Sequence, residues 1–159
     1  MESNNAAIEI IKTFENSHSI TTDKIEAITG MRLQEEKHSD ALDDFLGKST
    51  PNYKTYNSEG IQKELGVSSL KITETTGTSK NSVIYLEIKL HNPLPIDEVK
   101  KAWGSDYKLI VNRPTLPAGD KCIAQYLTTT TRLDFGFSDC ENMDHVIKIS
   151  ATKIKNGDI

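Results

Sequence analysis

The spacing of apolar residues changes along the chain from a helical period to a strand period. Up to residue 30, apolar residues recur at helical intervals, which predicts a helix over residues 6–16 and a second helix with Thr22 or Asp23 as its N-cap and Gly30 as its terminator. From Val67 onwards, apolar and polar residues alternate, which is typical of strands with one buried face. The pattern therefore predicts helices at the start of the chain and strands after them.

Two further short helices are predicted between these regions. One lies within residues 39–47, and the other begins at Asn57 or Ser58 and ends at Gly66. The strand pattern that follows is interrupted at Asn92–Pro95 and again by a helix at Asp97–Trp103, which Gly104 closes. The predicted strands are Leu70–Thr73, Ile84–Leu90 with its even-numbered residues inward, Tyr107–Val111, Cys122–Thr130, Leu133–Phe137 and Val146–Ala151.

This order of elements predicts an α+β fold, an antiparallel sheet with helices packed on one face. A length of 159 residues without a conventional linker predicts a single domain over residues 1–159.

Two stretches of the chain match each other in their landmarks. Residues 23, 25 and 30 match residues 97, 99 and 104 at an offset of 74, and the strand pair 70–86 matches 133–149 at an offset of 63. The difference of 11 indicates an insertion in the acidic segment of the first copy. Two interpretations remain, a tandem duplication with halves 18–91 and 92–154 or one irregular α+β domain.

Composition and charge exclude several classes of protein. The chain has a net charge of −4 and a pI of about 5.6, which does not suit a nucleic-acid binder, and Tyr53–Tyr56 is the nearest stretch of interleaved aromatic and basic residues. No apolar run approaches the length of a transmembrane helix. The segment after Met1 lacks a secretory signal, so we expect a cytoplasmic protein, or a periplasmic one if a signal or lipobox was removed; a lipid anchor on the precursor is compatible with the polar start.

Residues that carry chemistry do not form a known catalytic pattern. The four histidines, His18, His38, His91 and His145, lie outside any nucleophile motif, and the acidic clusters lack calcium-loop spacing. We therefore predict no catalytic residues, no metal, no cofactor and no enzymatic activity. Cys122 and Cys140, 18 residues apart, are either a disulfide or two buried thiols.

Two surfaces are candidates for binding another protein. The first is the polar face of the predicted sheet, and the second is the acidic segment, whose charge can attract a basic partner. The candidate residues are Tyr85, Glu87, Lys89, Arg132, Asp134 and Lys148 on the sheet, and Glu35, Glu36, Asp40, Asp43 and Asp44 in the acidic segment.

Each stretch, a short helix closed by glycine and then a strand meander, resembles the repeat unit of beta-lactamase inhibitor protein and related small outer-membrane lipoproteins of barrel assembly. The resemblance covers residues 20–34 and 67–152, and it is clearest at Leu133–Phe137 and Val146–Ile149. The chain differs from the inhibitor family in having no cysteine pair in the first copy and few aromatic residues.

The resemblance implies that an exposed sheet face binds a partner protein. We expect a bacterial inhibitor or immunity protein that occludes a toxin or enzyme. The alternatives are an accessory lipoprotein of the cell envelope and a small ligand-binding or enzymatic α+β domain.

Overall fold

A computed structural model describes residues 3–17, 20–35, 53–58, 66–75, 82–112, 121–138, 140–141 and 143–154 of the chain. These residues form an α+β fold with one antiparallel sheet, as the sequence predicts. The elements are α1 Ser3–Asn16, α2 Thr22–Thr29, β1 Leu33–Glu35, β2 Tyr53–Ser58, β3 Val67–Thr75, β4 Ser82–Pro95, α4 Ile96–Trp103, β5 Lys108–Asn112, β6 Lys121–Leu127, β7 Thr131–Phe137 and β8 His145–Lys153. No helix among the described residues is long and apolar enough to cross a membrane.

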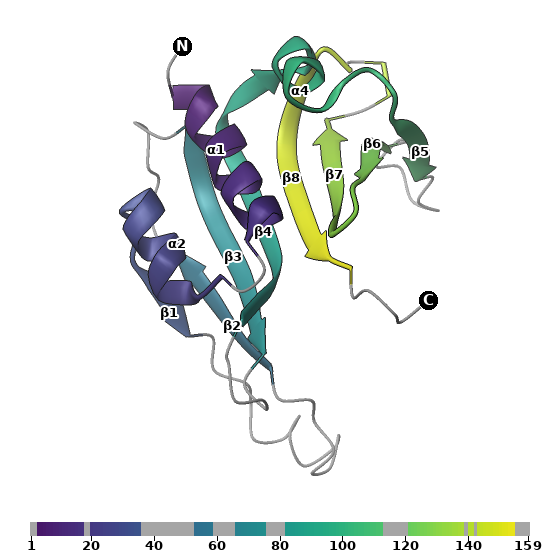
Figure 1. The fold of residues 1–159 in the computed structure, drawn as a ribbon. Helices are drawn as coiled ribbons and strands as arrows, with labels where there is room; N and C mark the ends of the chain where they lie inside the picture. Colours follow the sequence, from purple (N-terminus) through teal and green to yellow (C-terminus); the bar gives the residue numbers. More distant parts are fainter. Residues whose placement is uncertain are drawn as a thin grey trace, which may run out of the picture.

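The eight strands form one open sheet in the order β1-β2-β3-β4-β8-β7-β6-β5 (Figure 1). Each half of the sheet is an antiparallel meander, and the two meanders meet where β4 pairs with β8. The strands β1 and β5 are therefore the two edges, and β4 and β8 lie at the centre.

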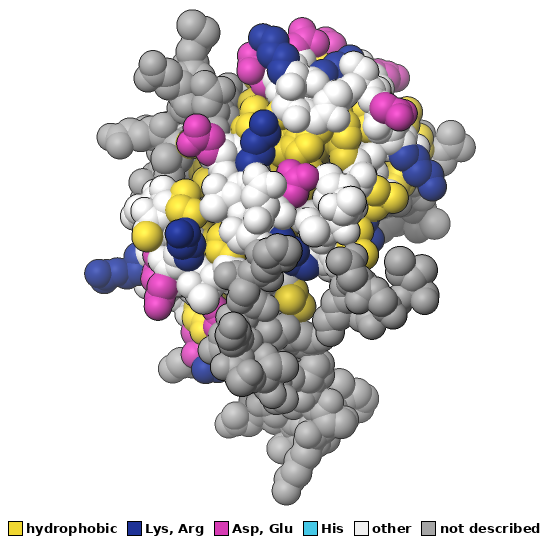
Figure 2. Space-filling model, viewed as in Figure 1, with side chains coloured by type: hydrophobic (Ala, Val, Ile, Leu, Met, Phe, Trp, Pro, Cys, Tyr) yellow, Lys and Arg dark blue, Asp and Glu magenta, His cyan; other side chains and the backbone are white. Residues whose placement is uncertain are grey.

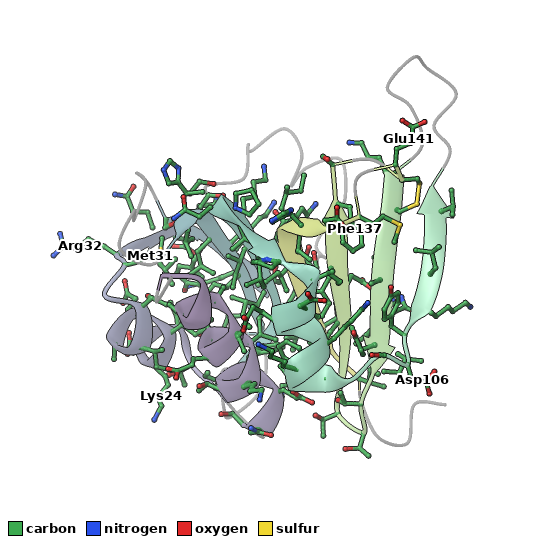
Figure 3. All side chains as sticks on the ribbon, turned by 90° about the horizontal axis from the view of Figure 1, so that it is seen from above. Lys24, Met31, Arg32, Asp106, Phe137 and Glu141 are labelled. Carbon is green, nitrogen blue, oxygen red and sulfur yellow. A yellow bond between two sulfur atoms is a disulfide. The ribbon has the colours of Figure 1, made fainter. Side chains whose placement is uncertain are left out.

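The hydrophobic core lies between the helices and one face of the sheet (Figures 1 and 3). Ile11 and Phe14 of α1, Ile25 of α2 and Val99 of α4 are almost fully buried against this face. One row of the core crosses five strands through directly paired residues: Leu70, Ile88, Ile149, Phe135 and Ala124. Because side chains alternate along each strand, the opposite face of the sheet carries the polar residues between them.

The ends of α2 are capped almost as predicted. Gly30 has a φ of 70° and its N–H donates to the carbonyl of Glu26, so it ends the helix in the left-handed conformation. The N-cap is Thr21, one residue before the predicted position, because its hydroxyl accepts from the N–H of Lys24 at 3.2 Å. Thr22 instead donates to the buried carboxylate of Glu74 on β3.

Asn57 and Ser58, predicted to cap a helix, are the last residues of the strand β2, and residues 59–65, where the rest of that helix is predicted, lie outside the described residues. The strand β2 contains no aliphatic residue, and it forms by pairing with both β1 and β3. The Ser58 hydroxyl accepts from the N–H of Leu70 on β3 at 2.9 Å. Residues 39–47, where another helix is predicted, lie outside the described residues.

The break predicted at Asn92–Pro95 holds only in part: the pairing of β4 with β8 is irregular between Lys89 and Leu94, but the strand continues to Pro95. The inward position predicted for Ile84 does not hold. A second shift of register leaves Ile84 as an extra residue between Val83 and Tyr85, and Val83 is the buried one.

The hairpins β3–β4 and β7–β8 have the same register at an offset of 63 residues. Ile72 pairs with Leu86 as Phe135 pairs with Ile149, and the extra residue Ile84 has its counterpart in Ile147. The helices α2 and α4, eight residues each, keep the offset of 74. These matches support the tandem duplication, which stays a prediction; its proposed division between residues 91 and 92 lies within β4.

Candidate functional site

The face of the sheet opposite the helices, here called the outer face, holds all six sheet residues predicted to bind a partner. Register pairs place them together: Tyr85 lies opposite Thr152, Glu87 opposite Ser150, and Lys89 opposite Lys148. Asp134 lies opposite Ser150, and Arg132 opposite Thr152. By register, the described residues of β3 to β8 on the outer face include Lys71, Thr73, Tyr85, Glu87, Lys89, Lys108, Ile110, Lys121, Ile123, Gln125, Leu127, Arg132, Asp134, Gly136, Lys148, Ser150 and Thr152.

The outer face is basic although the whole chain is acidic. Its described residues include six cations and two carboxylates, whereas the chain has a net charge of −4. Both carboxylates are already paired: Glu87 with Lys148 at 3.3 Å and Asp134 with Arg132 at 3.3 Å. The side chains of Lys71, Lys89, Lys108 and Lys121 have no ion-pair partner among the described residues. The uncompensated charge of this face is therefore positive.

Tyr85, Glu87 and Lys148 form one polar cluster where β4 pairs with β8. The Tyr85 hydroxyl donates to Glu87 Oε1 at 3.0 Å, and Lys148 Nζ lies 3.3 Å from the same oxygen. Burial and the neighbouring carboxylate raise the pKa of Tyr85. Burial alone would raise the pKa of Glu87, but the hydrogen bond from Tyr85 and the Lys148 ammonium outweigh it and lower that pKa. Tyr85 is thus a fixed, half-buried residue rather than a free projecting one.

A second polar cluster lies on β7 and β6. Gln125 donates to Asp134 Oδ1 at 2.9 Å, while Arg132 Nε lies 3.3 Å from Oδ2 of the same carboxylate. Leu127 lies opposite Arg132 and is 68% exposed. An exposed leucine beside a fixed guanidinium is a combination that suits a protein contact.

A hollow of about 340 Å³ opens between these clusters. It lies over Gly136 of β7, where a side chain is missing between Ile123 of β6 and Lys148 of β8. The shift of register at Ile147 turns that residue outward, so that it lines the hollow and is 39% exposed. The full lining is Lys121, Cys122, Ile123, Asp134, Gly136, Phe137, Ile147, Lys148 and Ser150.

Cys122 and Cys140 form a disulfide, which is one of the two alternatives left by the sequence. It joins β6 to the turn that precedes β8, on the side of the molecule where Phe137 and Glu141 lie (Figure 3). Cys122 and Phe137 both line the hollow, so the disulfide fixes one end of it.

The acidic segment falls largely outside the described residues. Glu35 ends β1 and lies 3.6 Å from Lys54 of β2, on the helix side of the sheet. Glu36, Asp40, Asp43 and Asp44 are not among the described residues. Glu35, the described member of the acidic segment, thus lies on the side of the sheet opposite the outer face.

Candidate catalytic and metal-binding groups are dispersed. His91 and His145 are exposed residues at different positions along β4 and β8, and His18 and His38 lie outside the described residues. Among the residues that are described, no group of three histidine, cysteine, aspartate or glutamate side chains is placed to hold a metal ion.

The helix side of the molecule differs in charge from the outer face. Figure 2, which views this side, shows lysine and arginine interspersed with aspartate and glutamate. At the edge strand β5, Leu109 and Val111 point to the helix side and are 47% and 42% exposed. These two residues form a second exposed apolar surface, which is an alternative to the outer face for contact with another protein.

Several outer-face residues are not among the predicted binding residues. Lys71, Lys108, Lys121 and the apolar residues Ile110, Ile123 and Leu127 lie there by register. Alternation within β3, β5 and β6 marks them, but only the pairing of strands shows that they form one surface. Gly136 is the sequence feature that points to the hollow, because glycine inside a strand often marks a bulge or the close approach of another group.

Comparisons with known proteins return no match, neither to a protein-family model, nor to a curated protein, nor to a solved structure.

Proposed function

We propose that this chain is a non-enzymatic protein-binding module that inhibits a toxin or enzyme, as an inhibitor or immunity protein does, by docking the outer face of its sheet onto an acidic surface of that protein. The observation that carries the proposal is the positive charge of a rigid sheet face that the described helices leave open. Occlusion of a partner's site requires such a surface and needs no chemistry from the chain.

The charge distribution favours a protein partner with an acidic site. Four of the six outer-face cations have no ion pair among the described residues, so an approaching carboxylate replaces water rather than an existing partner. Arg132 and Tyr85 are held in place by Asp134 and Glu87, so little side-chain entropy is lost when they make contact. Arginine and tyrosine are residues that often dominate the binding energy of interfaces.

The first test is capture of a partner from lysate and secreted fractions of the organism that encodes the chain, with two matched double variants. Lys89→Glu with Arg132→Glu reverses two charges on the outer face, and Lys24→Glu with Arg32→Glu reverses two exposed charges elsewhere, one on α2 and one directly before the edge strand β1. Figure 3 shows Lys24 and Arg32 pointing away from the sheet. Both double variants change the net charge equally.

We expect the native chain and the Lys24/Arg32 variant to capture one protein at a 1:1 ratio and to inhibit its activity. We expect the Lys89/Arg132 variant to lose at least tenfold in affinity, which equals about 1.4 kcal/mol. Equal capture by both variants contradicts the proposal. Loss with Leu109→Lys alone would move the docking site to the edge strand β5 and would also contradict it.

A further inference from the structure

Gly136 occupies the middle of a strand, where glycine normally weakens a sheet. Its φ is not positive, so the backbone does not require glycine. A Cβ at this position would lie 3.7 Å from the carbonyl oxygen of Lys148 and 3.8 Å from its Cβ, which are ordinary contacts. Neither backbone conformation nor packing within the described residues therefore explains the missing side chain.

The neighbouring bulge does not explain it either. The β3–β4 hairpin has the same register and the same extra residue, and Thr73 occupies the position that corresponds to Gly136. A threonine is thus compatible with this bulge. The remaining reason for glycine inside a strand is the close approach of another group.

The hollow over Gly136 has an apolar wall and a cationic rim. Ile123 and Ile147 form the wall, and Lys121 and Lys148 supply the cations of the rim. Asp134 also lines the hollow, but its carboxylate is already paired with Arg132 and Gln125. Lys148 lies directly opposite Lys89 on the neighbouring strand, and like charges in that arrangement repel each other. Glu87, 3.3 Å from Lys148, offsets one of these two charges, and a further negative charge at the rim offsets the other. The volume of about 340 Å³ is at the lower end of the range for small-ligand sites.

We propose that this hollow is the recognition pocket of the outer face and that it takes an apolar side chain of the docked protein next to an aspartate or glutamate. The apolar group lies over Gly136 between Ile123 and Ile147, and the carboxylate contacts the ammonium groups of Lys121 and Lys148. This inference rests on the proposed function, because it names the chemistry that the outer face recognises.

The direct test uses small probes that join an apolar ring to a carboxylate, a neutral amide or an amine. The ¹⁵N-labelled full chain is titrated with phenylacetate, with the neutral phenylacetamide and with the cationic phenethylamine, and amide chemical shifts are recorded. We expect phenylacetate to shift the amides of Ile123, Gly136 and Ile147 and to bind about threefold more tightly than phenylacetamide, as an exposed ion pair provides. Equal binding of acid and amide, or shifts at scattered lysines only, overturns the proposal.

Gly136→Thr fills the hollow with the residue that the chain itself has at the corresponding position 73. We expect the variant to keep or raise the melting temperature, because threonine favours strands, and to bind phenylacetate at least tenfold more weakly. The control is Thr152→Val, which changes an outer-face residue that does not line the hollow. Undiminished binding by Gly136→Thr would overturn the proposal.

Capture with the same variant separates this inference from the proposed function. If Gly136→Thr lowers capture of the partner as strongly as Lys89→Glu with Arg132→Glu does, both are supported. If Gly136→Thr captures normally while the charge reversal does not, the pocket is wrong and the outer-face docking stands. If neither variant affects capture, both are wrong.

Discussion

Glu87 is the residue on which the polar cluster of β4 and β8 depends, because it accepts from Tyr85 and pairs with Lys148. Its pKa in the folded chain lies below the ordinary glutamate value, so its contribution to stability is complete above that ordinary value, about 4.3, and is lost as the pH falls through the folded pKa. We expect Glu87→Gln to reduce stability at pH 7 by about 1 kcal/mol and to weaken the loss of stability between pH 5 and pH 3.

Urea unfolding at several pH values measures this effect. The control is Glu98→Gln, since Glu98 pairs with Lys101 on the exposed side of α4. That variant is expected to stay within about 0.5 kcal/mol of the native chain. If the free energy of unfolding of Glu87→Gln falls with pH as steeply as that of the native chain, Glu87 does not stabilise the fold through its carboxylate.

Lys153 is a second residue with a specific structural role. Its ammonium donates to the carbonyls of Phe14, Glu15 and Ser17 at 2.5, 3.2 and 2.7 Å, at the end of α1. The Phe14 carbonyl also accepts from the N–H of Ser17 at 3.4 Å and the Glu15 carbonyl from the Thr130 hydroxyl at 3.1 Å, so Lys153 supplements these bonds at the end of the helix. Lys153→Met is expected to lower the free energy of unfolding by about 1–3 kcal/mol, because it removes three hydrogen bonds to a charged group. Chemical denaturation of this variant beside Lys101→Met, an exposed lysine on α4, is the measurement, and equal effects would refute the role.

At the scale of single elements, strands are predicted correctly where apolar and polar residues alternate clearly and are missed where they do not. The strands β3, β7 and β8 were found because aliphatic residues alternate with polar ones in them. The strand β2 was missed because its sequence is polar, and pairing on both sides stabilises it rather than its own composition. Bulges were also missed, since an extra residue such as Ile84 changes which residues point inward without changing the composition.

The disulfide is the covalent connection between β6 and the turn before β8. Its two cysteines are 18 residues apart, and closing a loop of this length restricts the unfolded chain by about 3 kcal/mol. We expect the double variant Cys122→Ala with Cys140→Ala to lose about 2–4 kcal/mol and to exchange amide hydrogens faster at positions 140 and 141. Thermal unfolding and hydrogen exchange measure this, and a loss under 1 kcal/mol would contradict it.

At the scale of the whole molecule, the binding face could be predicted only in part. Alternation identified Tyr85, Glu87 and Lys89 on one strand and Arg132 and Asp134 on another, and register places them side by side. The excess of positive charge and the hollow depend on which strands pair. Strand order and bulges determine that pairing, and neither can be predicted from a single sequence.

The charge of the outer face leads to a prediction about binding kinetics. Because the attraction between a basic face and an acidic partner is screened by salt, we expect the association rate to fall at least tenfold between 0.02 M and 0.5 M sodium chloride. The dissociation rate is expected to change less. Stopped-flow measurement with the captured partner tests this, and a rate independent of salt would contradict electrostatic docking.

The most direct measurement of the central proposal is lysine footprinting of the complex with the captured partner. Lysines are acetylated in the free chain and in the complex, and mass spectrometry compares their reactivity. We predict protection of Lys71, Lys89, Lys121 and Lys148 on the outer face, while Lys24 and Lys101 on the helix side remain reactive in the same sample. Protection of Lys24 and Lys101 with reactive outer-face lysines would contradict docking through the sheet.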